Sequence, residues 1–188
     1  MLVLVIGLVL FLGVHSLRIV APAWRDTQYA RMGEGKWKGL YSVFALVGLL
    51  VLIWGYSLAR PEAPVLYEPP VWIKHVNALI MLAAFIIMGT NQRPAGAIKR
   101  AVKHPMLVST KLWAFGHLLA NGDLASVLLF GSFLAWAVAD RISLKRRAPV
   151  AATPGTWRDD AFALVVGGVL YAVFLFWAHD WLFGVPPL

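Results

Sequence analysis

The stretch KHPMLVSTKLWAFGHLLANGD, residues 103–123, decides the fold, because it sets costly polar side chains inside a long apolar run. Its Lys-His-Pro start predicts a turn that begins a helix, since a proline in the first helical turn removes an N–H that has no partner there. His117 lies thirteen residues after His104, too deep in the apolar run for a loop residue. We expect the Asn-Gly-Asp sequence at 121–123 to form a turn between two hydrophobic spans.

The composition around this stretch is that of an integral membrane protein whose main partner is the lipid bilayer. Of its 188 residues, 60% are hydrophobic and the mean hydropathy is +0.73, whereas globular proteins are roughly 45–50% apolar. The length predicts a single domain, residues 1–188. The absence of cysteine excludes disulfides, thiolate metal sites, c-type haem attachment and a cysteine nucleophile. Chemistry must therefore come from histidine, carboxylates, tyrosine or a cofactor.

Six apolar segments predict an all-α polytopic bundle of about six transmembrane helices, since a spanning backbone must satisfy its own hydrogen bonds. The first segment has no charged start and no small-residue cleavage site, so we interpret it as a retained span. The expected spans are Met1–Val20, Gly39–Ala59, Val71–Thr90, Met106–Ala120, Leu124–Ala139 and Ala161–Trp181. Spans four and five are expected to form an antiparallel hairpin. Span four rises only about 22 Å, short of the roughly 30 Å hydrocarbon core.

The basic residues predict the orientation. Of the 17 Lys and Arg residues, 14 lie in the loops after spans one, three and five, at 21–38, 91–104 and 140–160, when Arg18 at the end of span one is counted with the first loop. Because cytoplasmic loops retain Lys and Arg, we expect these three loops inside and both termini outside. The net charge of +8 therefore reflects membrane topology, and we expect no nucleic-acid partner.

His15 is the first candidate ligand, one turn before the end of span one, with Arg18 three residues on and on the same helix face. One interpretation is an interfacial histidine beside an arginine that reaches the headgroups. The other is a metal or haem ligand whose cationic neighbour suits a carboxylate such as a haem propionate.

His117 is the second candidate, because ionisable residues inside a membrane are costly and mark functional sites by default. Asn121 falls one helical turn further on. The small neighbours Ala114, Gly116 and Ala120 leave room for a planar ligand, or for close approach of another helix.

The other polar candidates have simpler interpretations. His104 lies in a basic loop, where a solvated or phosphate-contacting role is expected. His75 and His179 are expected to be interfacial anchors, with a second site as the alternative. Asp123 is expected to cap the helix of span five. Ala163, with Gly167 and Gly168, predicts a helix-packing surface.

Three pieces of sequence carry a resemblance to a known family. They are the first span ending His15-Ser-Leu-Arg18, the Lys-His-Pro sequence at 103–105, and the segment HLLANGD at 117–123, which is the most specific. With these, nearly the whole chain resembles the NnrU family of bacterial membrane proteins, to which the plant 15-cis-zeta-carotene isomerase is related.

The resemblance implies a multi-pass protein of the bacterial inner membrane linked to denitrification, through the expression or activity of nitric oxide reductase. From the isomerase branch it implies a b-type haem held by two histidines, which by position in this sequence are His15 and His117. Arg18, His104 and Asn121 are the further cofactor-binding candidates. A haem-dependent polyene cis–trans isomerase is the alternative function, and the resemblance leaves open whether the protein is an enzyme or a redox protein.

Two other classes of function remain open from the residues. Small membrane methyltransferases acting on isoprenylcysteine or phospholipids also have a basic residue before a His-Pro pair, but they need a downstream acidic residue in a C-terminal hairpin. Span six offers no carboxylate before Asp180. A non-catalytic partner of nitric oxide reductase or another respiratory membrane complex is the third class. Haem content separates the first class from these two.

Overall fold

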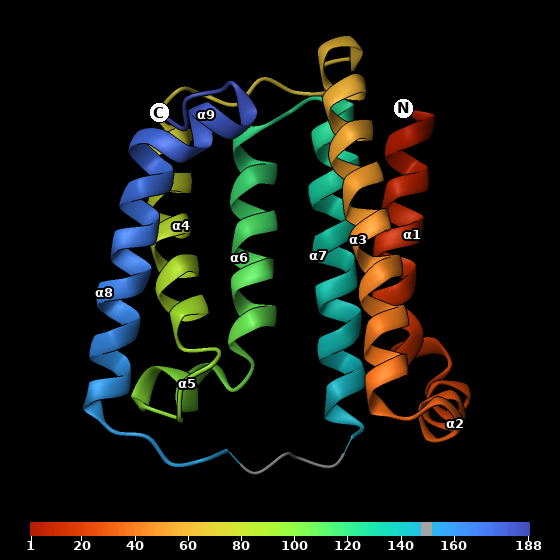
Figure 1. Cartoon of the computed structure of the whole chain (residues 1–188). Coiled ribbons are helices and arrows are strands. Elements are labelled where there is room, and N and C mark those ends of the chain that lie inside the picture. Colours follow the sequence, from red (N-terminus) through yellow and green to blue (C-terminus); the bar gives the residue numbers. More distant parts are fainter. Residues whose placement is uncertain (148–151) are drawn as a thin grey trace. The chain divides into compact units, whose positions relative to one another are not determined.

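The computed structural model describes residues 1–147 and 152–188, and most of these residues are in helices. Within that part, the only β contacts are two isolated bridges, Val65 with Asp123 and Ala95 with Pro154. The helices are α1 Leu2–Val20, α2 Pro22–Met32, α3 Glu34–Ala59, α4 Ile73–Gly89, α5 Ala97–Val102, α6 Pro105–Ala120, α7 Leu124–Lys145, α8 Trp157–Val173 and α9 His179–Phe183, with a 3₁₀ turn η1 Arg60–Glu62 and a π turn η2 Phe174–Ala178 (Figure 1).

Four helices of the described residues are long and apolar enough to cross a membrane. They are Leu2–Val20, Glu34–Glu62, Leu124–Lys145 and Trp157–Phe183, while Ile73–Gly89 is a shorter apolar helix. The prediction of an all-α fold is therefore confirmed, with four helices that are candidates for crossing a membrane. The six-span count, which also needs the 16-residue α6, and the outside position of both termini stay predictions.

Two segments predicted as loops contain helices. The first, residues 21–38, forms α2 and the first turn of α3, because Pro22 is well placed in a first turn and Gly33, at φ 77°, ends the helix. No residue of α2 is buried. Its composition is therefore polar, which made the segment look like a loop in the sequence. The second, residues 91–104, contains α5. The predicted loop 140–160 lies partly outside the described residues, and α7 continues into it as far as Lys145.

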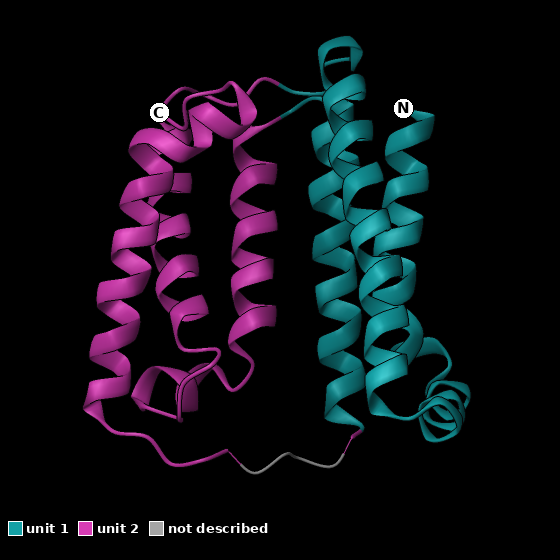
Figure 2. Ribbon diagram, in the orientation of Figure 1, with its two compact units in different colours: residues 1–67, 122–146 teal, residues 68–121, 147–188 magenta. Residues whose placement is uncertain are grey.

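The described residues form two compact units, residues 1–67 with 122–146 and residues 68–121 with 147–188 (Figure 2). Unit 1 contains α1, α2, α3 and α7. Unit 2 contains α4, α5, α6, α8 and α9. The prediction of a single domain over the whole chain stays a prediction.

In unit 1, glycines let α1 and α3 pack with their backbones in contact. A Cβ at Gly48 would lie 2.8 Å from the backbone nitrogen of Phe11, and a Cβ at Gly7 would lie 2.5 Å from Cα of Leu52. A Cβ at Gly55 would likewise collide with the backbone of Leu4. Any side chain at these positions would push the helices apart, so this glycine seam fixes the α1–α3 pair.

The segment before α7 is extended and paired, whereas a turn was predicted. Asn121 has φ −134° and ψ 114°, and Asp123 has φ −79° and ψ 151°. The carbonyl oxygen of Gly122 accepts from the backbone N–H of Leu66 at 2.8 Å, and Leu124 N–H donates to the oxygen of Pro64 at 2.9 Å. Asp123 does cap α7, accepting from the Ser126 N–H at 2.8 Å, as predicted. Pairing with a distant loop therefore replaces the local turn.

A buried chain of hydrogen bonds continues from this cap to α3. The hydroxyl of Ser126, a fully buried residue, donates to Asp123 Oδ2 at 2.6 Å and contacts the Tyr56 hydroxyl at 2.8 Å. Because the Ser126 proton is committed to the carboxylate, the Tyr56 hydroxyl must be the donor to Ser126. The chain therefore holds α3 against the start of α7.

In unit 2, small residues bring α4 close to α8. A Cβ at Gly167 would lie 2.6 Å from Cα of Ile86, and one at Gly89 would lie 3.0 Å from the carbonyl oxygen of Ala163. The predicted packing surface is thus confirmed for Ala163 and Gly167. A Cβ at Gly168 would meet nothing within 4 Å, so that residue is not part of it.

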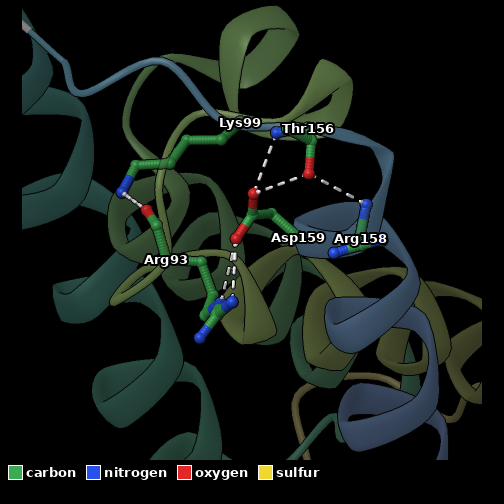
Figure 3. Close-up of polar contacts among 5 residues, drawn as sticks. All are labelled: Arg93, Lys99, Thr156, Arg158 and Asp159. Atoms are coloured by element: carbon green, nitrogen blue, oxygen red, sulfur yellow. Dashed lines mark hydrogen bonds and ion pairs between the residues drawn. The ribbon is translucent and has the colours of Figure 1, made fainter.

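A polar network joins the start of α8 to the segment 90–104 (Figure 3). Asp159 accepts from the Arg93 guanidinium at 2.9 Å and from the Thr156 N–H at 2.9 Å, where it completes a capping box. Asp160 accepts from the backbone N–H groups of Ala97 and Ile98, at the first turn of α5. Lys99 Nζ donates to the carbonyl oxygen of Arg93 at 2.7 Å. These bonds make one end of unit 2 a single hydrogen-bonded structure.

Candidate functional site

His15 lies on α1, five residues before the helix ends at Val20. Its Nδ1 is 2.6 Å from the carbonyl oxygen of Phe11, one turn earlier. A carbonyl can only accept, so Nδ1 carries the proton and the lone pair of the neutral ring is on Nε2. This is the tautomer that a histidine needs to bind a metal through Nε2, with its other ring nitrogen held by a backbone oxygen.

Aromatic rings of unit 1 surround the His15 imidazole. The ring centres of Phe11, Tyr41 and Trp136 lie 4.3, 5.5 and 6.0 Å from it, the last two edge-on. Trp136 Nε1 is buried and has no hydrogen-bond partner among the described residues. An unpaired buried N–H is costly, and it is the kind of donor that a bound ligand would satisfy.

Two further features of unit 1 involve residues close to His15 in α1. Arg18, the predicted partner of an acidic group, is exposed on α1. A pocket of about 220 Å³ is lined only by apolar and aromatic side chains of α1, α2 and α3, Val14, Trp37 and Tyr41 among them. Tyr41 therefore contacts both the pocket and the His15 ring.

His117 lies on α6 of unit 2, three residues before the helix ends. Its Nδ1 is 2.8 Å from the carbonyl oxygen of Trp113, so its lone pair is also on Nε2. At the adjacent Gly116, a Cβ would collide with Oδ1 of Asn77, a buried atom without a hydrogen-bond partner in the described part of the chain. The space predicted beside His117 is thus taken by a helix contact at Gly116.

Asn121 and His104 were predicted to bind a cofactor together with His117, but only Asn121 lies next to it. The Asn121 side-chain amide donates to the backbone oxygen of His117 at 2.9 Å, so its nearest role is to cap α6. His104 precedes α6 at its other end, about 20 Å along the helix from His117. The structure therefore separates His104 from the His117 imidazole. Before His104, Lys103 has φ 63°, a strained backbone angle that makes the predicted turn.

His179, which was predicted to be an interfacial anchor, lies beside His117. The two ring centres are 6.4 Å apart and the ring planes make an angle of 19°. Its Nδ1 is 2.7 Å from the carbonyl oxygen of Val185, so His179 shares the tautomer of the other two histidines. Sequence reasoning missed this pair because the residues are far apart in the chain.

The described residues contain no group of three or more His, Cys, Asp or Glu side chains able to hold a metal ion.

The family model described as NnrU protein matches residues 3–187, nearly the whole chain. Searches of the curated proteins and of the solved structures found no match.

Proposed function

The chain belongs to the NnrU family, and from that premise we propose that it is a multi-pass protein of the bacterial inner membrane that binds one b-type haem. In this proposal His15 and His117 are the two iron ligands. The protein serves denitrification, in support of nitric oxide reductase or another respiratory membrane protein.

The observation that carries the proposal is the state of the two imidazoles, each described within its own unit. Each Nδ1 is bonded to the carbonyl oxygen of the residue four positions earlier, at 2.6 Å for His15 and 2.8 Å for His117. A backbone partner on one nitrogen fixes the ring orientation and makes the other nitrogen a better ligand. A neutral imidazole is also a ligand that an apolar helix can hold at low cost.

The surroundings of His15 add support. Trp136 offers a buried N–H that is unpaired within the described residues, and Arg18 follows three residues after His15. An N–H and a guanidinium are donors that suit a propionate. In this proposal the protein orients the group by its imidazoles and excludes water by its apolar rings. When bound, the haem would supply electron transfer or the binding of a small gas.

The proposed topology has six spans, with α4 and α6 as the short ones, and both termini outside. Figures 1 and 2 together support it unit by unit: the α2 segment lies at the same end of unit 1 as the end of α7, and the α5 segment lies at the same end of unit 2 as the start of α8. These are the basic segments. Their clustering is expected if that end of each unit faces the cytoplasm.

Visible spectra of the purified protein, oxidised and reduced, test the proposal. We expect a Soret band and the sharp bands of low-spin haem at about one haem per chain. A protein expressed with adequate haem supply that shows no Soret band would leave only family membership and the helical membrane fold.

A further inference from the structure

The apolar pocket of unit 1 follows one face of α3, beginning beside α2. Four of its lining residues are on α3, namely Trp37, Leu40, Tyr41 and Phe44, and they recur at the three- and four-residue spacing of a single helix face. Trp37 is in the first turns of α3, and Phe44 lies seven residues further into the helix, about 10 Å along its axis. The lining therefore extends from the polar start of the helix into its apolar part.

A cation lies beside the pocket where α3 begins. The guanidinium carbon of Arg25 on α2 is 5.8 Å from the ring centre of Trp37, the one buried residue of the lining, and 4.8 Å from that of Tyr29. A guanidinium stacked on aromatic rings keeps its N–H groups directed along its own plane, where they can donate to a phosphate. Arg25 Nη1 already donates to Asp26 at 2.8 Å, but Asp26 is exposed and such a surface pair contributes little, so a phosphate can compete for it.

Helix α2 leaves its side chains uncovered. None of its 11 residues is buried, and an isolated helix of about that length is only marginally stable in water. Trp24, which lines the pocket, is 52% exposed, and its ring meets that of Trp37 edge-on at 6.3 Å. Exposed tryptophan and arginine side chains suit the headgroup region of a membrane. A lipid bound in the pocket would cover side chains of α2 that the protein leaves exposed.

We propose that this pocket binds an anionic phospholipid, with its phosphate at Arg25 and part of one acyl chain along Trp37 and Phe44. Segment 18–38 has five Lys and Arg residues and two acidic ones, so its charge complements an anion. An apolar cavity of about 150 Å³ holds a benzene ring, so the 220 Å³ here accommodates part of an acyl chain. Phe44 is exposed, and the rest of the chain can continue past it into the bilayer. The bound lipid would tie α2 to α1 and α3.

The test is lipid binding to the full chain purified in a neutral detergent, measured by native mass spectrometry. Phosphatidylglycerol and phosphatidylcholine with the same acyl chains are compared. We expect phosphatidylglycerol to bind about tenfold more tightly, and Arg25→Gln to lose most of this preference, because a hydrogen bond between charged groups is worth about that factor. Leu40→Trp adds bulk to the lining at a residue that is 44% exposed, so it should weaken the binding of both lipids without repacking the core. Leu40→Ala should keep the preference.

The matched control is Arg31→Gln, which removes the same charge from an exposed position in the last turn of the same helix. It should change the preference by less than about twofold, as expected of a solvated surface charge. Equal losses in Arg25→Gln and Arg31→Gln, or wild-type protein that binds both lipids equally, would overturn the inference. Millimolar inorganic phosphate should not displace the lipid; displacement would indicate a phosphate site that makes no use of the apolar pocket, and would also overturn it.

This inference does not depend on the proposed haem. Lipid binding and the haem spectrum are separate measurements on the same purified protein. A protein that fails the lipid test therefore leaves the proposed function standing, and a protein without haem leaves the lipid site standing.

Discussion

Gly122→Ala is expected to destabilise the protein by about 2–3 kcal/mol. A methyl group at this position would overlap the carbonyl oxygen of Tyr67, so the segment before α7 must move away from the loop. Gly122 accepts two backbone hydrogen bonds there, from Leu66 at 2.8 Å and Tyr67 at 3.3 Å. Each is worth about 1 kcal/mol, and the crowding costs about 1 kcal/mol more.

The assay is thermal unfolding of the purified protein in detergent, where this loss corresponds to a fall in Tm of roughly 4–12 °C. Gly131→Ala in α7 is the matched control, since a Cβ there meets nothing within 4 Å. Because alanine favours a helix over glycine by about 1 kcal/mol, the control should be neutral or stabilising. A Gly122→Ala protein that melts with the wild type would refute the pairing of this segment.

Three other predictions concern the haem ligand, the topology and the polar network of unit 2. His117→Ala should abolish the low-spin haem spectrum because His117 is one of the two proposed haem ligands, while His75→Ala keeps it; low-spin haem in the His117 variant would contradict the assignment. Reporter fusions at Leu188 and near Gly96 should report opposite sides of the membrane, and two cytoplasmic signals would rule out the six-span topology. Asp159→Ala removes the N3 half of the capping box that begins α8, and an ion pair with Arg93, so it should lower the unfolding free energy by about 1–2 kcal/mol in a denaturant titration; an unchanged midpoint would show that the network adds no stability.

Local signals in the sequence were sufficient for much of the fold. Hydrophobic runs predicted α1 and α6 within one residue, because a membrane helix needs a continuous apolar stretch. Asp123 was predicted as a cap because a carboxylate before an apolar run accepts from the first helical N–H groups. Close packing at Gly167 was predicted because small residues inside a membrane span let a neighbouring helix approach closely.

Features that depend on distant residues could not be predicted. The Asn-Gly-Asp sequence has the composition of a turn, but pairing with Pro64–Tyr67 holds it extended. The polar composition of α2 resembles that of a loop, because none of its residues is buried and the helix therefore needs few apolar side chains. His179 could not be paired with His117, since a π turn leaves no clear mark in the sequence and shifts the helical register.

The glycine seam between α1 and α3 has a consequence for biogenesis. The seam needs only the first 59 residues, so this pair can form as soon as both helices have left the ribosome and entered the bilayer. Unit 1 is completed by α7, which is made only after the whole segment 68–121 has been synthesised, about 3–10 s later at ordinary rates of elongation. The α1–α3 pair is therefore expected to form before α7 is available, and mutations in the seam should act first on insertion and yield.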